Sequence, residues 1–379
     1  MKIHQSLYTQ QNWQTCSETA DFSADKAQLV LVFGERKSLE QVKPYNYLRS
    51  IYPSADIVIN STAGEICCDK IYDEAITVTA IELEKTAVRA KQIEISTYTE
   101  SFALGEQLAQ ALSDDNLAAI FVISDGSYVN GSDLTMAMGQ YLNHQVPITG
   151  GLAGDAARFE KTLVGLNQDP TIGKVVGIGF YGDSLKIGYG SKGGWDVFGP
   201  EREVTSSKYN VLYQIDSTKA LDLYKEYLGK YAANLPAAAL LFPLSIRATQ
   251  DSQPLVRTIL GIDEKEKSMT FAGEMPEKAL VRFMTANLDR LIDASATATH
   301  HSLAKLDFKP ELAILVSCVG RKLVLGQRTE EEVEVAQEIL GADTVITGFY
   351  SYGEISPTHP NDRCELHNQT MTVTVLSEN

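Results

Sequence analysis

AQLVLVFGE, residues 27–35, is the first strand-like run of a pattern that decides the fold class of this chain. A helical stretch at 39–52 follows it, then ADIVINSTAGEI at 55–66 and AITVTAIEL at 75–83. The unit therefore reads strand, helix, strand, Gly–acid pair and strand. A strand–helix–strand unit of this length fits a crossover that lies over one face of a sheet.

The same unit occurs twice more, and its spacing is conserved within the chain. From the first strand to the glycine there are 37 residues in the first two copies (Ala27 to Gly64, Leu117 to Gly154) and 41 in the last (Leu312 to Gly353). The second copy consists of LAAIFVISD (117–125), a helix near 132–142, VPITGGLAGD (146–155) and VVGIGFYG (175–182). The third copy consists of ELAILVSCV (311–319), a helix at 329–340, ADTVITGFYSYGEI (342–355) and MTVTVLSE (371–378). Gly273–Glu274 resembles a degenerate fourth copy.

Nearly continuous apolar strands are typical of strands buried on both faces, so we predict an α/β fold. We expect two related sheet-and-helix domains built from these repeated units, at 26–215 and 216–379, after an N-terminal extension at 1–25. Apolar residues at helical spacing also predict a long helix over 277–306.

Composition and charge exclude several classes of function. The 379 residues carry a net charge of -16, which disfavours binding to nucleic acid or to an anionic membrane surface. The N-terminus has no apolar signal segment, and no apolar run approaches the roughly 18 residues that a membrane span needs. We therefore expect a cytoplasmic protein without structural disulfides, since its cysteines show no even framework: Cys16, Cys67, Cys68, Cys318 and Cys364.

The acids of the Gly–acid pairs are candidate ligand-binding residues. Glu65, Asp155 and Glu354 each follow a buried strand, at the strand end where open α/β sheets bind ligands. Tyr352 precedes Glu354 in an aromatic segment, and aromatic walls with few polar groups are typical of small-molecule sites. The alternative is structural: the glycines form tight turns and the acids cap backbone amides.

Two further segments contribute candidates. Arg321 lies between a strand and a helix, where it could bind an anionic group or form a surface salt bridge. In the segment CELHNQT, His367 could ligate haem iron, hydrogen-bond a ligand together with Asn368, or be an ordinary core histidine. If it binds iron, strand alternation makes Glu365 the candidate that orients its ring.

The segments NSTAGEI, GGLAGD, SCVGRKLVLGQRTEEEVE, GFYSYGEISP and CELHNQT together resemble the FIST family of bacterial sensory modules over residues 26–379. The resemblance implies a small-molecule ligand and signalling through a partner such as a histidine kinase or a cyclic-di-GMP enzyme. Some stand-alone members are haem proteins that sense nitric oxide. The resemblance thus makes haem b a candidate cofactor, with His367 as its iron ligand.

Three hypotheses follow from these observations. The first is a sensor based on haem, the second is a sensor of a small metabolite such as an amino acid without haem, and the third is an enzyme that uses the pocket carboxylates. No pairing of a nucleophile with a base is recognisable, so we expect a protein that is not an enzyme and has no catalytic residues.

Overall fold

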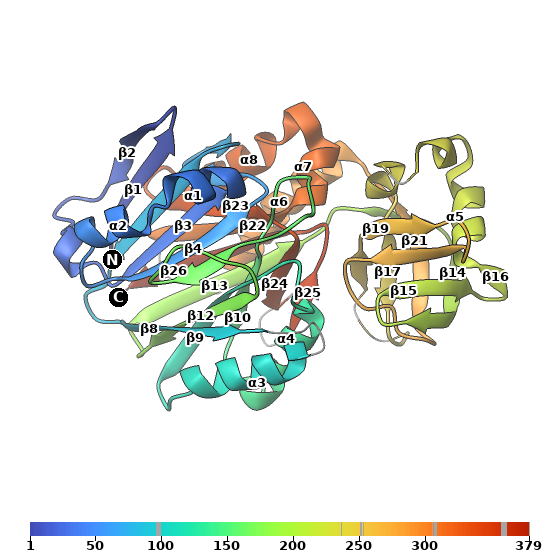
Figure 1. Cartoon of the computed structure of the whole chain (residues 1–379), viewed down its shortest axis with the longest axis horizontal. Coiled ribbons are helices and arrows are strands. Elements are labelled where there is room, and N and C mark those ends of the chain that lie inside the picture. The colour runs from blue at the N-terminus through green and yellow to red at the C-terminus, as the bar shows by residue number, and fades with distance from the viewer. Residues whose placement is uncertain are drawn as a thin grey trace.

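The computed structural model describes residues 1–95, 100–235, 237–250, 252, 254–304, 306, 309–357 and 362–378. Figure 1 shows a larger body, which contains both chain ends, and a smaller body beside it. The chain enters the smaller body after β13 (Leu185–Lys192) and leaves it before α6 (Leu288–Leu303). In the described part of the chain, no helix is long and apolar enough to cross a membrane.

Three six-stranded sheets form the larger body. The first sheet has the order β11 (Val164–Leu166), β4 (Asp56–Thr62), β3 (Leu29–Glu35), β7 (Ile76–Glu82), β1 (Lys2–Thr9), β2 (Asn12–Glu18). The second has β25 (Cys364–His367), β24 (Gly353–Pro357), β10 (Ile148–Leu152), β9 (Leu117–Ser124), β12 (Lys174–Tyr181), β8 (Ala87–Glu94). The third has β13, β26 (Met371–Glu378), β22 (Leu312–Cys318), β23 (Val345–Ser351), β5 (Glu65–Cys67), β6 (Lys70–Tyr72).

Each sheet is centred on one parallel pair of strands. The pairs are β3–β4, β9–β10 and β22–β23, and the first strand of each pair is also bonded to an antiparallel strand, β7, β12 or β26. The α/β fold class is therefore confirmed, with mixed sheets. That the three repeated units superpose stays a prediction.

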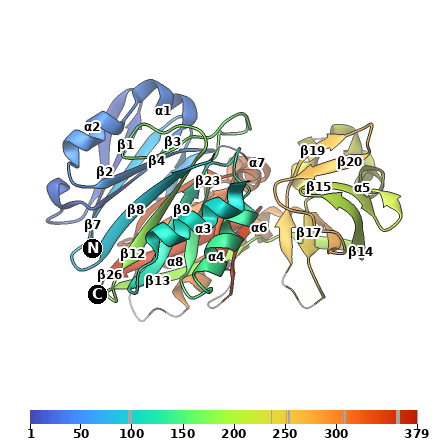
Figure 2. The same ribbon diagram turned by 60° about the horizontal axis from the view of Figure 1, so that its bottom comes forward.

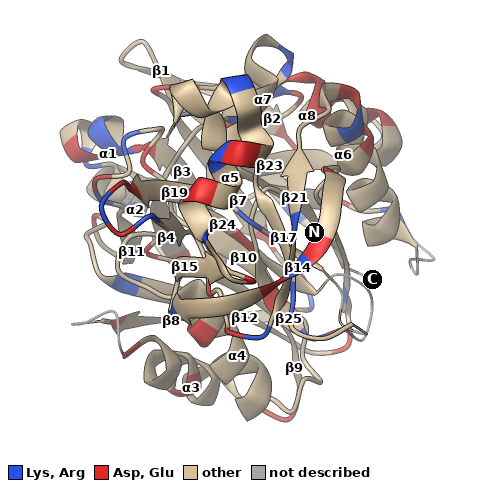
Figure 3. Cartoon of the chain, turned by 90° about the vertical axis from the view of Figure 1, so that its right-hand side faces the viewer, with Lys and Arg blue, Asp and Glu red and all other residues tan. Residues whose placement is uncertain are grey.

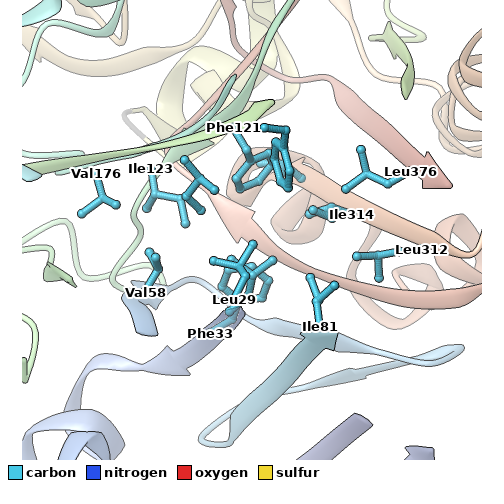
Figure 4. Close-up of a cluster of buried hydrophobic side chains, with 14 of the residues drawn as sticks. Leu29, Phe33, Val58, Ile81, Phe121, Ile123, Val176, Leu312, Ile314 and Leu376 are labelled. Carbon is cyan, nitrogen blue, oxygen red and sulfur yellow. The ribbon is translucent and has the colours of Figure 1, made fainter. Parts of the chain in front are cut away.

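Alternation along the strands gives each sheet two buried faces. Leu29, Phe121 and Ile314 point into one core that all three sheets share, and Figure 4 shows side chains of this core converging from strands of the three sheets. Neighbouring residues such as Val30 and Ile120 point outward instead, against helices. The nearly continuous apolar runs follow from this arrangement, because every position of these strands is covered.

Helices cover the outer face of each sheet (Figure 2). The first sheet carries α1 (Arg36–Val42) and α2 (Tyr45–Ile51), the second carries α3 (Ser101–Leu112) and α4 (Gly131–Tyr141), and the third carries α6 and α8 (Glu331–Leu340). Strands far apart in the sequence share sheets, since β24 pairs with β10 and β5 pairs with β23.

Backbone hydrogen bonds join the carboxyl ends of the parallel strands into a ring. Each bond connects one sheet to the next, so the ring passes through all three sheets. The bonds run from Ala63 N to Tyr350 O (2.8 Å), from Tyr352 N to Leu152 O (3.2 Å) and from Gly154 N to Ser61 O (2.9 Å).

The smaller body is an eight-stranded sheet that, in its described residues, carries the α-helix α5 (Ala220–Leu228) and two short 3-10 helices, η3 (Gly229–Asn234) and η4 (Ala237–Leu241). Its strands are β14 (Asp196–Lys208), β15 (Val211–Ile215), β16 (Thr218–Lys219), β17 (Leu244–Arg247), β18 (Leu255–Arg257), β19 (Ile259–Asp263), β20 (Ser268–Phe271) and β21 (Leu280–Thr285). The boundary expected at Asp216 lies between β15 and β16, inside this sheet. Figure 3 shows acidic and basic residues interspersed on the face of the molecule that carries this body.

The helix predicted over 277–306 is wrong in its first third. Residues Leu280–Thr285 form β21, which pairs with β14 and β17, and the helix begins only at Leu288. Asn287 caps it by accepting a hydrogen bond from the Arg290 backbone N–H. The side chains at 280, 283 and 284 fit helical spacing, but sheet pairing decides their conformation.

Candidate functional site

A cavity of about 610 Å³ lies between the two bodies. One wall comes from the carboxyl ends of the central strands of the larger body: Gly126 after β9, Leu152 in β10, Cys318 in β22 and Tyr352 after β23. The opposite wall comes from the smaller body and includes Asn210, Thr258 and Phe271. A ligand in this cavity would therefore contact both bodies at once.

The walls of the cavity are mainly aromatic and aliphatic. Among its described lining residues Glu160 is the only charged one, and this carboxylate already accepts a hydrogen bond from Arg36 Nη2 at 2.8 Å. The Thr258 hydroxyl is buried and has no hydrogen-bond partner among the described residues. The site thus suits an uncharged, largely apolar molecule with few polar groups.

Phe159 lies on the cavity in a strained conformation. Its φ is +54°, which is unfavourable for an aromatic residue, and 47% of its surface is exposed. Tyr352 holds it in place: the two rings stack with centroids 4.7 Å apart, and the Phe159 backbone N–H donates to Tyr352 Oη at 3.0 Å. Strain that the surroundings maintain at a cavity is typical of a binding site.

Two side chains fasten the smaller body to the larger one beside this cavity. Trp195 Nε1 donates to the Gln369 carbonyl at 2.9 Å, and Arg257 Nη1 donates to the Leu366 carbonyl at 3.2 Å. Burial lowers the pKa of Arg257 to about 10, although Glu365 and Glu274 lie near enough to oppose the shift. The contact between the bodies thus includes directional polar bonds beside an apolar cluster of Trp195, Met284, Leu291 and Leu325.

Glu354 lies behind the cavity wall and does not line it. Its carboxylate accepts hydrogen bonds from the Ser351 hydroxyl at 2.5 Å and from the Thr370 hydroxyl at 2.9 Å and backbone N–H at 3.1 Å. Burial raises the pKa of Glu354 to about 7, against these hydrogen bonds. Glu354 lies near Cys318, which does line the cavity.

Glu65 repeats this arrangement in another place. Its carboxylate accepts a hydrogen bond from the Thr62 hydroxyl and one from the Ala75 backbone N–H at 3.3 Å. Burial raises the pKa of Glu65 to about 8, and the nearby Lys322 opposes the shift. This carboxyl is fully buried and lines no described cavity, so its contacts are structural.

Asp155 is the centre of a buried ion cluster. Its Oδ1 accepts hydrogen bonds from Arg36 Nε and Arg158 Nε, both at 2.8 Å. Burial alone would raise the pKa of Asp155, but the bonds from the two guanidinium groups outweigh burial and lower it. Because both arginines are occupied by acids, this cluster leaves no free cation for an anionic ligand among the groups described.

Arg321 forms a buried ion pair, so a surface salt bridge is the wrong interpretation. Its Nε and Nη2 lie 3.0 and 2.7 Å from Glu332 Oε2, and neither side chain has exposed surface. The remaining donors bond the carbonyls of Gly193 at 2.6 Å and Leu291 at 2.8 Å. All of its named contacts are internal, and it does not line the cavity.

His367 is buried in β25, outside the cavity lining. Its Nε2 lies 2.8 Å from the Ser356 carbonyl, and burial lowers the pKa of the ring to about 4. The expectation that Glu365 orients the ring is wrong, because that carbonyl does so instead. The neighbouring amide of Asn368 is fully buried and has no partner among the described residues.

The structure thus brings only Tyr352 of the predicted residues to the cavity. Phe159, Thr258 and Phe271 were missed, and the last two lie in the smaller body. A signal was available for Phe159, which follows the pair Gly154–Asp155, and for Phe271, which precedes Gly273–Glu274, but not for Thr258.

An apolar cavity at the strand ends of three α/β sheets, closed by a second body, defines a protein that binds small molecules. Family models agree with this class: the FIST N domain matches residues 28–218 and the FIST C domain matches residues 220–357. The chain belongs to the FIST family, whose domains are sensory and bind ligands rather than catalyse reactions. An uncharacterised protein of Methanocaldococcus jannaschii is 21% identical over 387 aligned positions, which cover 91% of this chain and 72% of that protein.

Proposed function

We propose that this chain senses an uncharged small molecule in the cavity between its two bodies. The observation that carries the proposal is that the strand ends of the larger body and the sheet of the smaller body each form one wall. A ligand that contacts both walls stabilises one relative arrangement of the bodies, which is how binding can alter a distant surface.

The lining argues for a neutral, aromatic or aliphatic metabolite. A free amino acid or a phosphate would bring a negative charge, and none of the described lining residues is a Lys, Arg or His. Phe159 supplies a half-exposed ring backed by Tyr352, on which a planar ligand can stack. An uncharged ring compound therefore fits better than the amino-acid-like ligand.

We do not place haem at His367. The ring is buried and lies outside the described lining of the cavity, which contains no histidine. The Ser356 carbonyl on Nε2 would leave only Nδ1 for iron. Cys318 does line the cavity, but burial and the nearby Glu354 raise the pKa of its thiol, which disfavours the thiolate that iron would need. An absorption spectrum of the protein mixed with haemin checks this point: a Soret band that disappears in His367→Ala would restore the haem hypothesis.

We further propose that the signal passes to a partner, a histidine kinase or a cyclic-di-GMP enzyme. Support comes from the sensory character of FIST domains. Autophosphorylation of such a purified kinase should change when this protein is added, and the ligand should alter the size of that change.

The binding proposal is tested with uncharged aromatic metabolites screened by thermal shift and followed by calorimetry. Phe159→Ala should weaken binding roughly tenfold, because a stacking contact contributes about 1 kcal/mol or more. Ala272→Phe should abolish binding by filling the cavity, which Ala272 lines.

Tyr47→Ala is the matched control for Phe159→Ala. Tyr47 is 46% exposed and stacks on Trp13 at 5.2 Å, away from the cavity. Equal weakening in both variants, or full binding by Ala272→Phe, would overturn the proposal.

A further inference from the structure

The Thr258 hydroxyl is a buried polar group that the fold leaves without a partner. Thr258 lines the cavity between the bodies, only 5% of its surface is exposed, and its Oγ1 has no hydrogen-bond partner among the described residues. An unpaired buried hydroxyl lowers stability, because the group has lost its hydrogen bonds to water without replacing them. A ligand that bonds this hydroxyl would remove that cost.

The backbone around Thr258 fixes where its side chain lies. Thr258 links β18 to β19, and its carbonyl accepts a hydrogen bond from the Ala272 backbone N–H at 2.9 Å. The preceding residue, Arg257, lines a different cavity of about 240 Å³ and donates to the Leu366 carbonyl of the larger body at 3.2 Å. The segment that presents the hydroxyl therefore belongs to the smaller body and is bonded to the larger one.

Asn210 supplies a second free acceptor on the same wall. Its Nδ2 donates to the Phe271 carbonyl at 2.8 Å, and the Phe271 backbone N–H donates to the Asn210 carbonyl at 2.8 Å. Because a carbonyl can only accept, the amino half of the side chain must face Phe271, which leaves Oδ1 without a hydrogen bond among the described residues. Ala272, which bonds Thr258, follows Phe271 directly, so both polar residues are bonded to one short stretch of the lining.

The other oxygen-bearing side chains of the described lining are either engaged or exposed. The Tyr352 hydroxyl accepts a hydrogen bond from the Phe159 backbone N–H at 3.0 Å, and the Glu160 carboxylate accepts one from Arg36 at 2.8 Å. The remaining two are exposed: Ser127 and Tyr128. Recognition of a polar group inside the cavity therefore falls to the two groups on the smaller body.

We propose that Thr258, together with Asn210, selects ring compounds that carry an N–H or O–H donor, an inference that rests on the proposed binding of uncharged molecules in this cavity. Both side-chain oxygens can accept a hydrogen bond from a ligand, whereas only the Thr258 hydroxyl can also donate one. The ring of the ligand stacks on Phe159 of the larger body, so the ring and its donor are held by different bodies. A ring without a donor leaves these acceptors unpaired and binds more weakly.

Indole and benzofuran test the proposal, because they share one shape and differ in the N–H donor. In calorimetric titrations the wild-type protein should bind indole about fivefold more tightly than benzofuran, as expected for one neutral hydrogen bond. Thr258→Val keeps the shape of the side chain without its hydroxyl, so the preference for indole should fall, and it should vanish when Asn210→Ala is added. Thr258→Ser is the matched control, since it retains the hydroxyl and should retain the preference.

The melting temperature without ligand separates this role from a structural one. Since the hydroxyl has no partner among the described residues, Thr258→Val should melt at or above the wild-type temperature, and a clear fall would show that the hydroxyl is structural. Equal affinities of the wild-type protein for indole and benzofuran, or an undiminished preference in Thr258→Val, would overturn this inference and leave the cavity as a binding site for rings. Binding of neither compound, nor of any other uncharged ring, would overturn the proposed function as well.

Discussion

Glu65 and Glu354 hold equivalent positions at two different sheet junctions. Each accepts a hydrogen bond from the hydroxyl three residues earlier and another from the backbone N–H that precedes β7 or β26. Glu65 thereby joins the third sheet to the first, and Glu354 joins the second to the third. Asp155, bound to Arg36 at the start of α1, joins the second to the first. Each acid of the three Gly–acid pairs thus links two of the three sheets of the larger body by hydrogen bonds.

The two raised carboxyl pKa values predict a pH dependence of stability. Unfolded glutamate has a pKa of about 4.3, against about 8 for Glu65 and about 7 for Glu354. Because the folded state holds these protons more tightly, their contribution to the free energy of unfolding is complete below about pH 4 and is lost as the pH rises through 7 to 8.

Glu65→Gln together with Glu354→Gln should therefore flatten the fall in melting temperature between pH 5 and pH 8. A glutamine side chain does not titrate: its oxygen can accept from the backbone N–H, while its NH2 group can donate to the neighbouring hydroxyl oxygen. Glu226→Gln, an exposed change on α5, serves as the control. Equal pH profiles for the double variant and the control would contradict the prediction.

The buried pair of Arg321 and Glu332 should be costly to break. Arg321→Met leaves the Glu332 carboxylate buried without its partner, so we expect the free energy of unfolding in urea to fall by about 3–5 kcal/mol. The double variant Arg321→Met with Glu332→Gln should recover part of that loss. Arg328→Met removes exposed ion pairs with Asp289 and Glu331 and should change stability much less, because solvent screens exposed pairs. Similar losses of unfolding free energy in Arg321→Met and Arg328→Met would contradict the prediction that the buried pair is the more costly one to break.

Two glycines should be irreplaceable because they lie against the neighbouring strand. A Cβ at Gly348 would lie 1.9 Å from the Leu315 carbonyl oxygen, and one at Gly150 would lie 1.9 Å from that of Val122. Gly348→Ala should thus destabilise the protein by about 3 kcal/mol or more, since backbone must move. Gly261→Ala, with no atom within 4 Å of the new Cβ, should be tolerated. Chemical denaturation of both variants measures the free energy of unfolding and shows whether only Gly348→Ala lowers it.

Trp195 should report on the contact between the two bodies. In a Trp13→Phe background it is the single tryptophan, because the chain has two. Arg257→Ala removes the donor to the Leu366 carbonyl, so we expect red-shifted Trp195 emission with unchanged far-ultraviolet circular dichroism. Arg282→Ala, whose guanidinium bonds Gly199 within the smaller body, should leave the emission as it is. An unshifted spectrum in Arg257→Ala would show that other contacts hold the bodies together.

Local sequence patterns were enough to predict the central strands of the larger body, but not β8, nor β1 and β2, which lie in the expected N-terminal extension at 1–25. LVLVF, IFVIS and AILVS alternate between the shared core and the helices, and both environments are apolar, which is why the runs look continuous. The same reasoning failed at residues 280–285. Their spacing suits a helix, but pairing with β14 and β17 is a long-range effect that periodicity does not contain.

The candidate site was harder to predict for a related reason. Glu354 and Arg321 were chosen for their chemistry at strand ends, yet each found internal partners, Thr370 and Glu332, that lie many residues away. The cavity arises where the smaller body meets those strand ends. Thr258 could not be assigned to it from the sequence, because its place depends on how the two bodies pack.

The sharing of sheets between distant parts of the chain has a consequence for its synthesis. β10 pairs with β24, which follows about 200 residues later in the chain. Until β24 has been synthesised, the edge of β10 that it covers stays unpaired. At about 5–20 residues per second the ribosome takes roughly 10–40 s to make this stretch. During that time the apolar edge of a nascent chain is open to other chains, so yield in the cell should depend on chaperones that shield it until the last strands emerge.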